Sequence, residues 1–371
     1  MIRYISIFTL ALLAACSPSQ SGESSENGEH DHHSGASQTS QMHYPQETHL
    51  ANIRQLTFGG DNAEAYWSFD DTKLVFQSSN KNWGTSCDQI YIMNVAGEKD
   101  STALEMISTG HGRTTCSFFM PGDTTILYAS THLVHDTCPP VPVREHGGAY
   151  VWPVYAEFDI FVSDLEGNIL QRLTDTDGYD AEAVLSPNGD KILFTSMRSG
   201  DLELYTMDID GSNVLQITNT LGYDGGAFFS PDGSKIVWRA SRPTTDEEVA
   251  KYKGLLAKNQ VEPIEMELFV ANADGSDAHQ VTKLGSANWA PYFHPSGEKL
   301  LFSSNHASEK GYPFNLWMVN LDGSGLEQIT HDTMFDSFPM FSRDGKYLVW
   351  GSNRNNGRTR DTNLFLAEWV D

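Results

Sequence analysis

The chain has 371 residues, of which 39% are hydrophobic, and it carries a formal net charge of −25 from 49 acidic and 24 basic residues. Nucleic-acid binding requires clustered Lys and Arg, so this composition excludes nucleic acid as a partner. An acidic excess favours cations or basic partners, and it also serves to keep exported proteins soluble.

Residues 1–15 have the pattern of a secretory signal peptide. Arg3 supplies a positive charge, and residues 4–13 are an apolar run too short to span a bilayer permanently. Residues 13–16, Leu-Ala-Ala-Cys, resemble the bacterial lipobox. This resemblance implies that Cys16 is lipidated and anchors the mature protein to a membrane, on the periplasmic side of the bacterial cell envelope. An ordinary signal peptide with an incidental cysteine is the alternative.

Residues 16–50 follow as a lipidated cysteine and a tether. Ser, Gly, Gln, Glu and His dominate this segment, so it cannot bury enough apolar surface to fold and we expect it to be disordered. The His-Asp-His-His run at 30–33 has the ligand types of a transition-metal site. We favour a solvated linker over metal binding there.

The stretch 172–212 is the clearest copy of a pattern that recurs six times. Alternating apolar residues between short turns predict four strands in this copy, at 181–186, 191–196, 202–209 and 214–218. The turn residue Gly189 has counterparts 44 to 66 residues apart, at Asp71, Asp123, Gly233, Gly297 and Gly345. Four strands at this period are typical of a β-propeller, so we predict an all-β, six-bladed propeller over residues 51–371.

The ends of the repeat array predict how the ring closes. The last copy stops after its third strand, at 363–367, whereas a surplus strand at 53–57 precedes the first copy. We expect this N-terminal strand to complete the sixth blade, because that blade would otherwise leave an unpaired edge.

The long connections of the repeat all lie on one side of the predicted ring. They are the loops at 80–86, 131–157, 241–265, 305–313 and 353–361. Function tends to lie on variable loops over a rigid scaffold, so this face is the predicted binding surface. The loop at 241–265 contains a capping box, Thr245 with Glu248, which predicts a helix near 244–260 that packs on the ring rather than moving as a lid.

A polar residue recurs before the first strand of each blade. These residues are Asn62, Thr114, Asp180, Asp224, Asn288 and Asp336. We interpret them as caps that bind nearby backbone N–H groups; a polar ring at the channel mouth, extended by Glu64 and Glu182, is the alternative. Arginines on the loops between the second and third strands of the blades either pair with these acids or bind an anionic ligand such as a uronic acid or a peptide carboxyl end.

The residues assigned to the ligand-binding face are Asp180, Glu182, Arg198, Asp224, Arg239, Arg242, Asn305, Asp336 and Arg354. Histidines such as His132 and His306 lie on the same loops but are dispersed over several blades. Four carboxylates within eight residues, Asp175, Asp177, Asp180 and Glu182, have the oxygen ligands that Ca²⁺ prefers. A solvated loop is the preferred interpretation, and we expect no other cofactor.

Three cysteines follow Cys16 in the chain, namely Cys87, Cys116 and Cys138. Export to an oxidising compartment predicts one disulfide and one remaining thiol. We expect Cys116 to be one member of the pair, while the sequence does not choose between Cys87 and Cys138 as its partner. A catalytic or metal-binding cysteine is the alternative.

Several repeat motifs resemble those of the TolB-type six-bladed propellers, a family with WD-like repeats. They are Ser-Pro-Asn-Gly at 186–189, Ser-Pro-Asp-Gly at 230–233, the run at 205–211 and Gln-Ile-Thr at 216–218. Similar repeats occur in periplasmic scaffold proteins, in peptidases and in oligogalacturonate lyases. The chain lacks the N-terminal α/β domain of TolB and the G-x-S-x-G motif of the peptidases.

The resemblance therefore favours a lipid-anchored, non-enzymatic binding or scaffold propeller. Its expected partner is an envelope protein or peptide, or an anionic glycan, bound at the loop face. The alternative function is a metal-dependent polysaccharide lyase of the oligogalacturonate type, which would use histidine ligands in the propeller.

Overall fold

The computed structural model describes residues 42–95, 104–142, 150–309, 311–357 and 359–371. The signal peptide predicted at 1–15, the lipidation site Cys16 and the histidine run at 30–33 lie outside the described residues. Within the described residues, no helix has the length and apolar character needed to cross a membrane.

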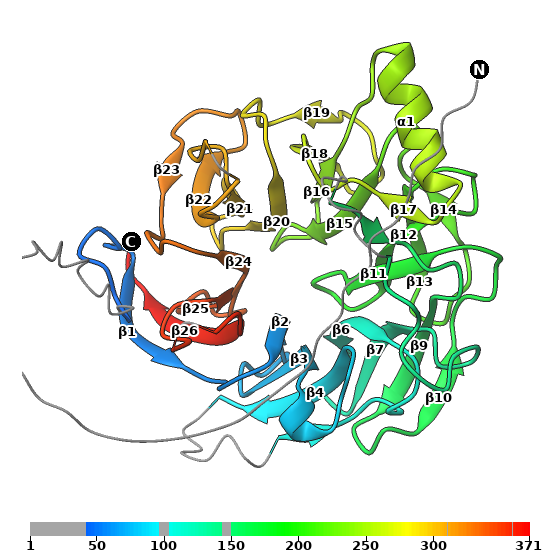
Figure 1. Cartoon of the computed structure of the whole chain (residues 1–371), viewed down its shortest axis with the longest axis horizontal. Helices are drawn as coiled ribbons and strands as arrows, with labels where there is room; N and C mark the ends of the chain where they lie inside the picture. The colour runs from blue at the N-terminus through cyan, green and yellow to red at the C-terminus, as the bar shows by residue number, and fades with distance from the viewer. Residues whose placement is uncertain (1–41, 96–103, 143–149, 310, 358) are drawn as a thin grey trace, which may run out of the picture. The chain divides into compact units, whose positions relative to one another are not determined.

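Six four-stranded antiparallel sheets, or blades, follow one another around a common axis (Figure 1). Blade one comprises β2 (Asp61–Trp67), β3 (Lys73–Ser79), β4 (Gln89–Asn94) and β5 (Glu105–Met106). Blade two comprises β6 (Thr114–Phe119), β7 (Thr125–Ser130), β9 (Asp159–Asp164) and β10 (Ile169–Arg172). Blade three comprises β11 (Asp180–Leu185), β12 (Lys191–Ser196), β13 (Glu203–Asp208) and β14 (Leu215–Gln216). Blade four comprises β15 (Asp224–Phe229), β16 (Lys235–Ala240), β18 (Glu267–Asn272) and β19 (His279–Gln280). Blade five comprises β20 (Asn288–Phe293), β21 (Lys299–Ser304), β22 (Asn315–Asn320) and β23 (Glu327–Gln328). Blade six comprises β24 (Asp336–Phe341), β25 (Tyr347–Ser352), β26 (Asn363–Trp369) and β1 (Leu50–Gln55). The predicted six-bladed propeller is confirmed.

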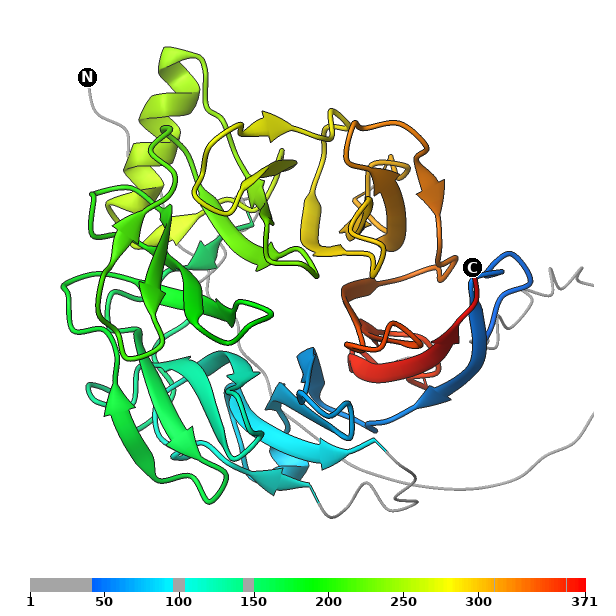
Figure 2. The same cartoon turned by 180° about the vertical axis from the view of Figure 1, so that it is seen from behind.

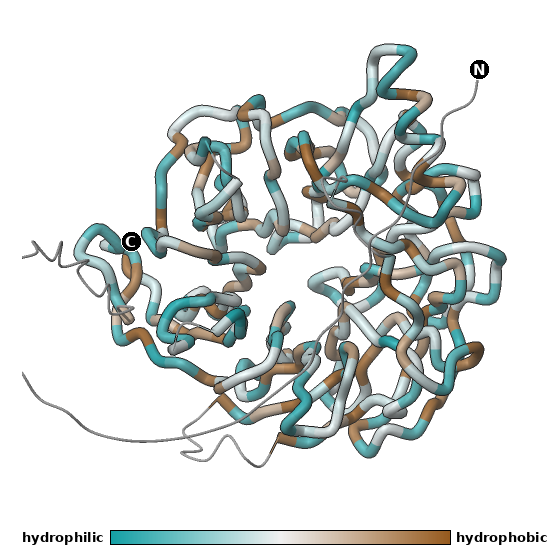
Figure 3. The backbone as a smooth tube through the Cα atoms, in the orientation of Figure 1, coloured by the Kyte–Doolittle hydropathy of each residue, from teal (hydrophilic) through white to brown (hydrophobic). Residues whose placement is uncertain are grey.

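The burial of each strand follows from its place in the blade. The second strands, such as β12 and β16, are buried at nearly every position because neighbouring blades cover both of their faces. The short fourth strands, such as β14 and β19, are exposed at the outer rim. Brown hydrophobic and teal hydrophilic segments alternate along the backbone (Figure 3). This gradient explains why continuous apolar runs mark the inner strands in the sequence.

The N-terminal strand closes the ring, as the repeat pattern predicts. β1 pairs antiparallel with β26, with Leu50 opposite Trp369 and Gln55 opposite Phe365. The blue β1 and the red β26 lie side by side in Figure 1. The strand begins three residues earlier than the expected 53–57, and the hydrogen bond from Leu56 N to Leu364 O (2.8 Å) extends the pairing beyond it.

Residues 42–49 correct the predicted extent of the tether. We expected disorder up to residue 50, but Glu47 is fully buried and forms an ion pair with Arg354 (3.0 Å). The Tyr44 hydroxyl donates to Asp332 (2.9 Å), and the His331 N–H donates to Glu47 (3.0 Å). These contacts attach the segment to blades five and six, so the folded part of the chain begins before β1.

Two insertions, from blades two and four, meet through a short strand pairing. α1 (Asp246–Leu256) begins at the expected capping box, with Thr245 accepting from Glu248 N, and it buries Tyr252 and Leu256 against the propeller. After the helix, β17 (Gln260–Val261) pairs with β8 (Trp152–Pro153) of the blade-two insertion. A short 3-10 helix, Lys81–Trp83, lies in the blade-one loop. Figure 2 shows α1 at the edge of blade four, packed against the ring as expected.

The first strand of every blade contains a β-bulge. The register between the first and second strands shifts at the same place in all six blades, for example between Ala181 and Val184. The bulged residues have φ between 47° and 59°; they are Glu64, Cys116, Glu182, Gly226, Ala290 and Phe338. Five of the six are not glycine. Such left-handed conformations are costly for side-chain-bearing residues and concentrate at functional sites.

Candidate binding site at the axis of the ring

A cavity of about 750 Å³ opens on the face that carries the long loops. Nine aromatic residues contribute to its wall: Tyr150, Trp152, Tyr155, Phe158, Tyr179, Trp289, Tyr312, Phe335 and Phe338. Trp152 packs against Trp289 with the rings tilted by 52° and their centroids 5.1 Å apart, so the β8–β17 pairing fixes part of this wall. We call this space the axial cavity. Its volume lies in the range of pockets that enclose a small molecule or the end of a polymer.

The floor of the axial cavity is formed by bulged residues of the first strands. Glu64, Cys116 and Glu182 line both the wide cavity and a narrow space of about 30 Å³ beneath it. At the equivalent position of blade four, Gly226 leaves room for the side chain of Arg239, because a Cβ atom at 226 would lie 1.9 Å from Arg239 Nη1. The bulges therefore gather one thiol, two carboxyls and one guanidinium on the axis.

Glu182 and Arg239 form a closed ion pair on this floor. Arg239 Nη2 donates to Glu182 Oε1 (2.5 Å) and to the Tyr223 hydroxyl (2.8 Å). Glu182 also accepts from Thr195, from the Tyr223 hydroxyl and from Gly226 N, at 2.8 to 3.0 Å. Burial on its own lowers the pKa of Arg239, but the neighbouring Tyr223 and Glu182 raise it on balance, so the guanidinium stays charged.

Glu64 and Cys116 form a second pair that contains no base. Cys116 Sγ donates to Glu64 Oε2 (2.8 Å), and the Tyr66 hydroxyl donates to the same oxygen (3.1 Å). Burial raises the pKa of the Glu64 carboxyl, although the Cys116 hydrogen bond opposes this shift. Burial and the nearby carboxylates raise the pKa of the Cys116 thiol well above its usual value, so it is protonated and donates. A thiol in that state is a poor nucleophile.

Three acids assigned to the ligand-binding face are structural instead. Asp180, Asp224 and Asp336 are fully buried, and each pairs with the arginine 18 residues later: Arg198 at 3.0 Å, Arg242 at 2.6 Å and Arg354 at 3.0 Å. The indole N–H groups of Trp238 and Trp350 also donate to Asp224 and Asp336. These acids bind side chains rather than capping backbone N–H groups, and they do not form a polar ring at the mouth.

Two further face residues lie differently from expectation. Arg239 belongs to the strand β16 rather than to a loop, which is why it reaches the axis. Asn305 braces its own loop, accepting from Ala287 N (2.9 Å) and donating to Gly311 O (3.0 Å). Of the nine residues assigned to the face, the structure brings Glu182 and Arg239 to the axial cavity.

The ligand set of the predicted calcium site is not assembled. Asp180 and Glu182 are committed to Arg198 and Arg239, while Asp175 and Asp177 are exposed in the preceding loop. Among the residues described, no group of three or more His, Cys, Asp or Glu side chains could hold a metal ion. His132 and His306 occupy the positions of the paired arginines, bonded to Ser130 and Ser304 and packed on Phe161 and Trp317.

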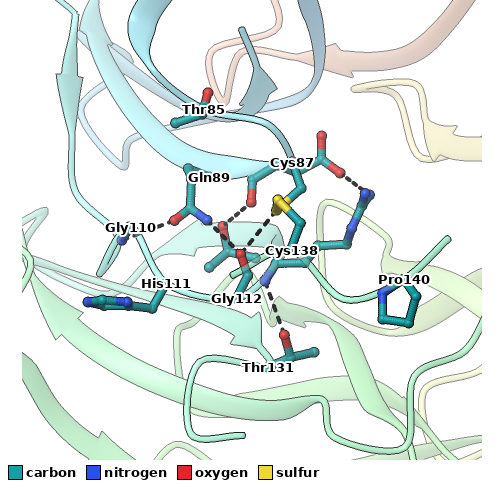
Figure 4. Close-up of a disulfide and its surroundings, with 12 residues drawn as sticks. Thr85, Cys87, Gln89, Gly110, His111, Gly112, Thr131, Cys138 and Pro140 are labelled. Atoms are coloured by element: carbon teal, nitrogen blue, oxygen red, sulfur yellow. Dashed lines mark hydrogen bonds and ion pairs between the residues drawn. A yellow bond between two sulfur atoms is a disulfide. The ribbon is translucent and has the colours of Figure 1, made fainter. Parts of the chain in front are cut away.

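The single predicted disulfide is present, but between the other two cysteines. Cys87 and Cys138 are joined, with Cα atoms 5.7 Å apart, while Cys116 is free and buried. Figure 4 shows the bridge beside Gly112, whose carbonyl also accepts from Gln89. The expectation that Cys116 pairs is wrong because its bulge turns the side chain to the axis, whereas Cys87 and Cys138 lie in neighbouring loops of blades one and two.

Sequence reasoning missed Cys116 and the aromatic wall as parts of the site. One usable signal was present, since Glu64, Cys116 and Glu182 each lie two residues after the recurring polar position. Aligning the six copies at that position shows that these three residues occupy equivalent places in their blades. The contribution of Trp152 was not accessible in this way, because it comes from an insertion that has no counterpart in the other blades.

Comparisons with known proteins agree with this fold. The family model described as the TolB beta propeller domain matches residues 155–262. A putative TolB from Agrobacterium tumefaciens is 17% identical with a TM-score of 0.55, over 86% of this chain and 97% of that one. TolB from Acinetobacter baumannii is also 17% identical with a TM-score of 0.50, over 74% of this chain; the match spans 56% of that protein's length.

An oligogalacturonate lyase in complex with manganese is 14% identical with a TM-score of 0.50, over 88% of this chain and 96% of that one. No protein of curated function matches the sequence significantly. At these identities the likeness to the solved structures shows the fold alone.

Proposed function

Because the chain is a TolB-like six-bladed β-propeller by fold, we propose that it is a non-enzymatic binding protein of the bacterial cell envelope. Its ligand is the end of a peptide, protein or glycan chain, which enters the axial cavity from the loop face. The observation that carries this proposal is the cavity of about 750 Å³, with aromatic walls and a polar floor.

The construction of the cavity supports binding. The first strands of the blades form its floor, and the Cys87–Cys138 disulfide and the β8–β17 pairing hold the adjacent loops. Little conformational entropy should therefore be lost when a ligand binds. Large aromatic surfaces provide most of the contact energy in such pockets, while a few fixed polar groups orient the ligand. The Glu182–Arg239 pair and Glu64 are those polar groups.

The lyase alternative receives less support from the residues. Such an enzyme needs a metal to acidify a proton beside a carboxylate. In the described part of the chain no three candidate ligands come together, and His132 and His306 are packed on aromatic rings of their own blades. The lining of the axial cavity holds three carboxyls, Glu64, Asp88 and Glu182, and one thiol, but Asp88 is paired with Arg113 and Glu182 with Arg239.

The location of the protein is also a proposal. The signal pattern at 1–15 and the resemblance of residues 13–16 to a lipobox support export and lipidation at Cys16. The protein would then face the periplasm with its propeller, attached through the N-terminal lipid.

Capture of partners from solubilised bacterial envelopes tests the binding proposal. Ala290→Phe places a large ring in the narrow space directly beneath the axial cavity, at the bulge position that Phe338 occupies in blade six with a similar φ. We expect this variant to fold and to lose the partners that the wild type captures. Ala257→Phe, the same substitution at an exposed residue after α1, is the matched control and should retain them.

Equal capture by Ala290→Phe and the wild type would overturn the assignment of the axial cavity. Metal analysis of the purified propeller runs beside the capture. About one equivalent of bound transition metal, together with double-bond formation on uronate oligomers, would replace the binding proposal with the lyase.

A further inference from the structure

The charges around the axial cavity do not balance at its floor. Arg113 pairs with Asp88 (2.5 Å) in the wall, and Arg239 pairs with Glu182 (2.5 Å). Glu64 is the carboxyl left over: among the described residues no Lys, Arg or His nitrogen lies within 4.0 Å of it. The remaining base in the lining, Arg360, is exposed at the rim.

Glu64 also has an oxygen available to a ligand. Both of its hydrogen bonds, from Cys116 and Tyr66, end on Oε2. Oε1 has no bonding partner in the described structure, and the side chain lines the axial cavity. A carboxyl in such a place either keeps its proton or takes a cation, because an ionised group without a counter-charge is costly to bury.

The wall above Glu64 favours a cation as well. Aromatic faces attract ammonium and guanidinium groups. The cavity already shows this contact, since the Arg239 guanidinium lies over the ring of Trp152 at 5.3 Å. Tyr179, Trp289 and Phe338 add further ring surface along the route to the floor.

An anionic end of the ligand is disfavoured on the same grounds. Both hydrogen bonds of Arg239, to Glu182 and to Tyr223, come from Nη2, and its Nε is buried without a hydrogen-bond partner, but its positive charge is already paired with Glu182. An anion at the floor would also lie between Glu182 and Glu64. The net charge of −25 on the whole chain further raises the local concentration of cations.

We propose that the axial cavity selects a ligand whose inserted end carries a primary ammonium group, with Glu64 Oε1 as the acceptor and the aromatic wall as its surroundings. This inference rests on the proposed function, because it names the chemistry of the ligand in the same cavity. The ammonium comes from a lysine side chain or from a free peptide N-terminus, and both present the same three donors.

Calorimetric titration of the purified propeller with short glycine peptides tests the inference and separates the two sources. One probe is pentaglycine amide with a free N-terminus, and its neutral match is N-acetylated. The other is an N-acetylated pentapeptide amide with a central lysine, matched by the same peptide with acetyl-lysine. We expect at least one charged probe to bind about tenfold more tightly than its neutral match, or about 1.4 kcal/mol.

Glu64→Gln is the variant for this test, because glutamine keeps the shape and can still accept from Cys116 and Tyr66. It should remove the preference for the charged probe while leaving the melting temperature at or above that of the wild type. Glu105→Gln, the same substitution at an exposed rim residue of blade one, should keep the preference.

Equal binding of charged and neutral probes, no binding of any probe, or a preference that survives Glu64→Gln would each overturn the inference. The proposed function has a separate readout. The proposed function is wrong if Ala290→Phe captures envelope partners as well as the wild type does. This outcome does not depend on which peptide probe binds.

Discussion

At the scale of single residues, the polar residue at the start of each first strand is matched to the residue 18 positions later. Where the polar residue at the start of a first strand is Asp, the residue 18 positions later is Arg, as in Asp224 and Arg242. Where it is Asn or Thr, the later residue is Asn or His, as in Asn288 and His306. The buried charge and its counter-charge thus change together among the six copies, which indicates a structural role.

Arg242→Ala should therefore destabilise the fold, by about 3–5 kcal/mol, because it leaves the buried Asp224 carboxylate without its partner. Even with Arg242 present, burial raises the pKa of Asp224 to about 6. The measurement is urea unfolding at pH 7. Adding Asp224→Asn to the variant should recover part of the loss, and Arg360→Ala at the exposed rim should change little. An unchanged midpoint for Arg242→Ala would contradict the structural role.

Glu203 makes the stability of the propeller depend on pH. Burial raises its pKa from the usual 4.5 to about 8, and its Oε2 has no hydrogen-bond partner. The folded state therefore holds a proton that the unfolded chain releases. This contribution to stability is complete below about pH 4.5 and is lost as the pH rises through 8.

Glu203→Gln should flatten this dependence, so that the variant exceeds the wild type in free energy of unfolding at pH 8 and approaches it at pH 5. Urea midpoints at pH 5, 6, 7 and 8 provide the measurement. Glu105→Gln, at an exposed residue, should follow the wild-type curve. Parallel curves for Glu203→Gln and the wild type would rule out a raised pKa at this residue.

At the scale of elements, we expect deletion of β1 and the segment before it to lower the stability of the propeller most. Deleting residues 42–57 removes the β1–β26 pairing and leaves Arg354 without Glu47. We expect the melting temperature to fall by roughly 10 °C or more. Deleting residues 17–41 should leave it unchanged, because the Glu47 contacts and β1 are retained. Calorimetry of both deletions decides, and equal melting temperatures would mean that closure does not depend on β1.

The strands themselves were predictable from the sequence, but the bulges within them were not. Period and turn chemistry locate the second strands because their apolar runs are unbroken, as in β12. A residue with φ near 50° is usually signalled by glycine, and here Gly226 is the single glycine among six such positions. Glu64 and Cys116 have no local signal for that conformation, so their direction toward the axis depends on the assembled blade.

At the scale of the whole molecule, the ring was predictable and its cavity was not. Six copies and a displaced strand suffice to predict a closed propeller. The axial cavity requires the convergence of bulged residues from four blades with an insertion from blade two and a strand from blade four, as Glu182, Trp152 and Arg239 show. The error in the disulfide has the same origin, because sequence spacing does not say which cysteine faces the axis.

The proposed membrane anchoring concerns the molecule as a whole. Cys16→Ser should move the protein from the membrane fraction to the soluble fraction, because the acyl chains would have no attachment site. Fractionation followed by immunoblotting measures this shift. A variant that retains the signal peptide but changes Ser17 to Ala is the control, and recovery of Cys16→Ser in membranes at the wild-type level would disprove lipidation at this residue.

The closure by β1 also fixes the order of events during synthesis. The hydrogen bond from Asn52 to Glu368 joins residues 316 positions apart, so β1 is synthesised long before its partner β26 and has to wait for it. Contacts of such long range are formed slowly. Until then β1 and β26 both present unpaired edges, on which nascent chains can aggregate. Chaperones that cover exposed strands should therefore matter more for this chain than for a propeller closed by neighbouring strands.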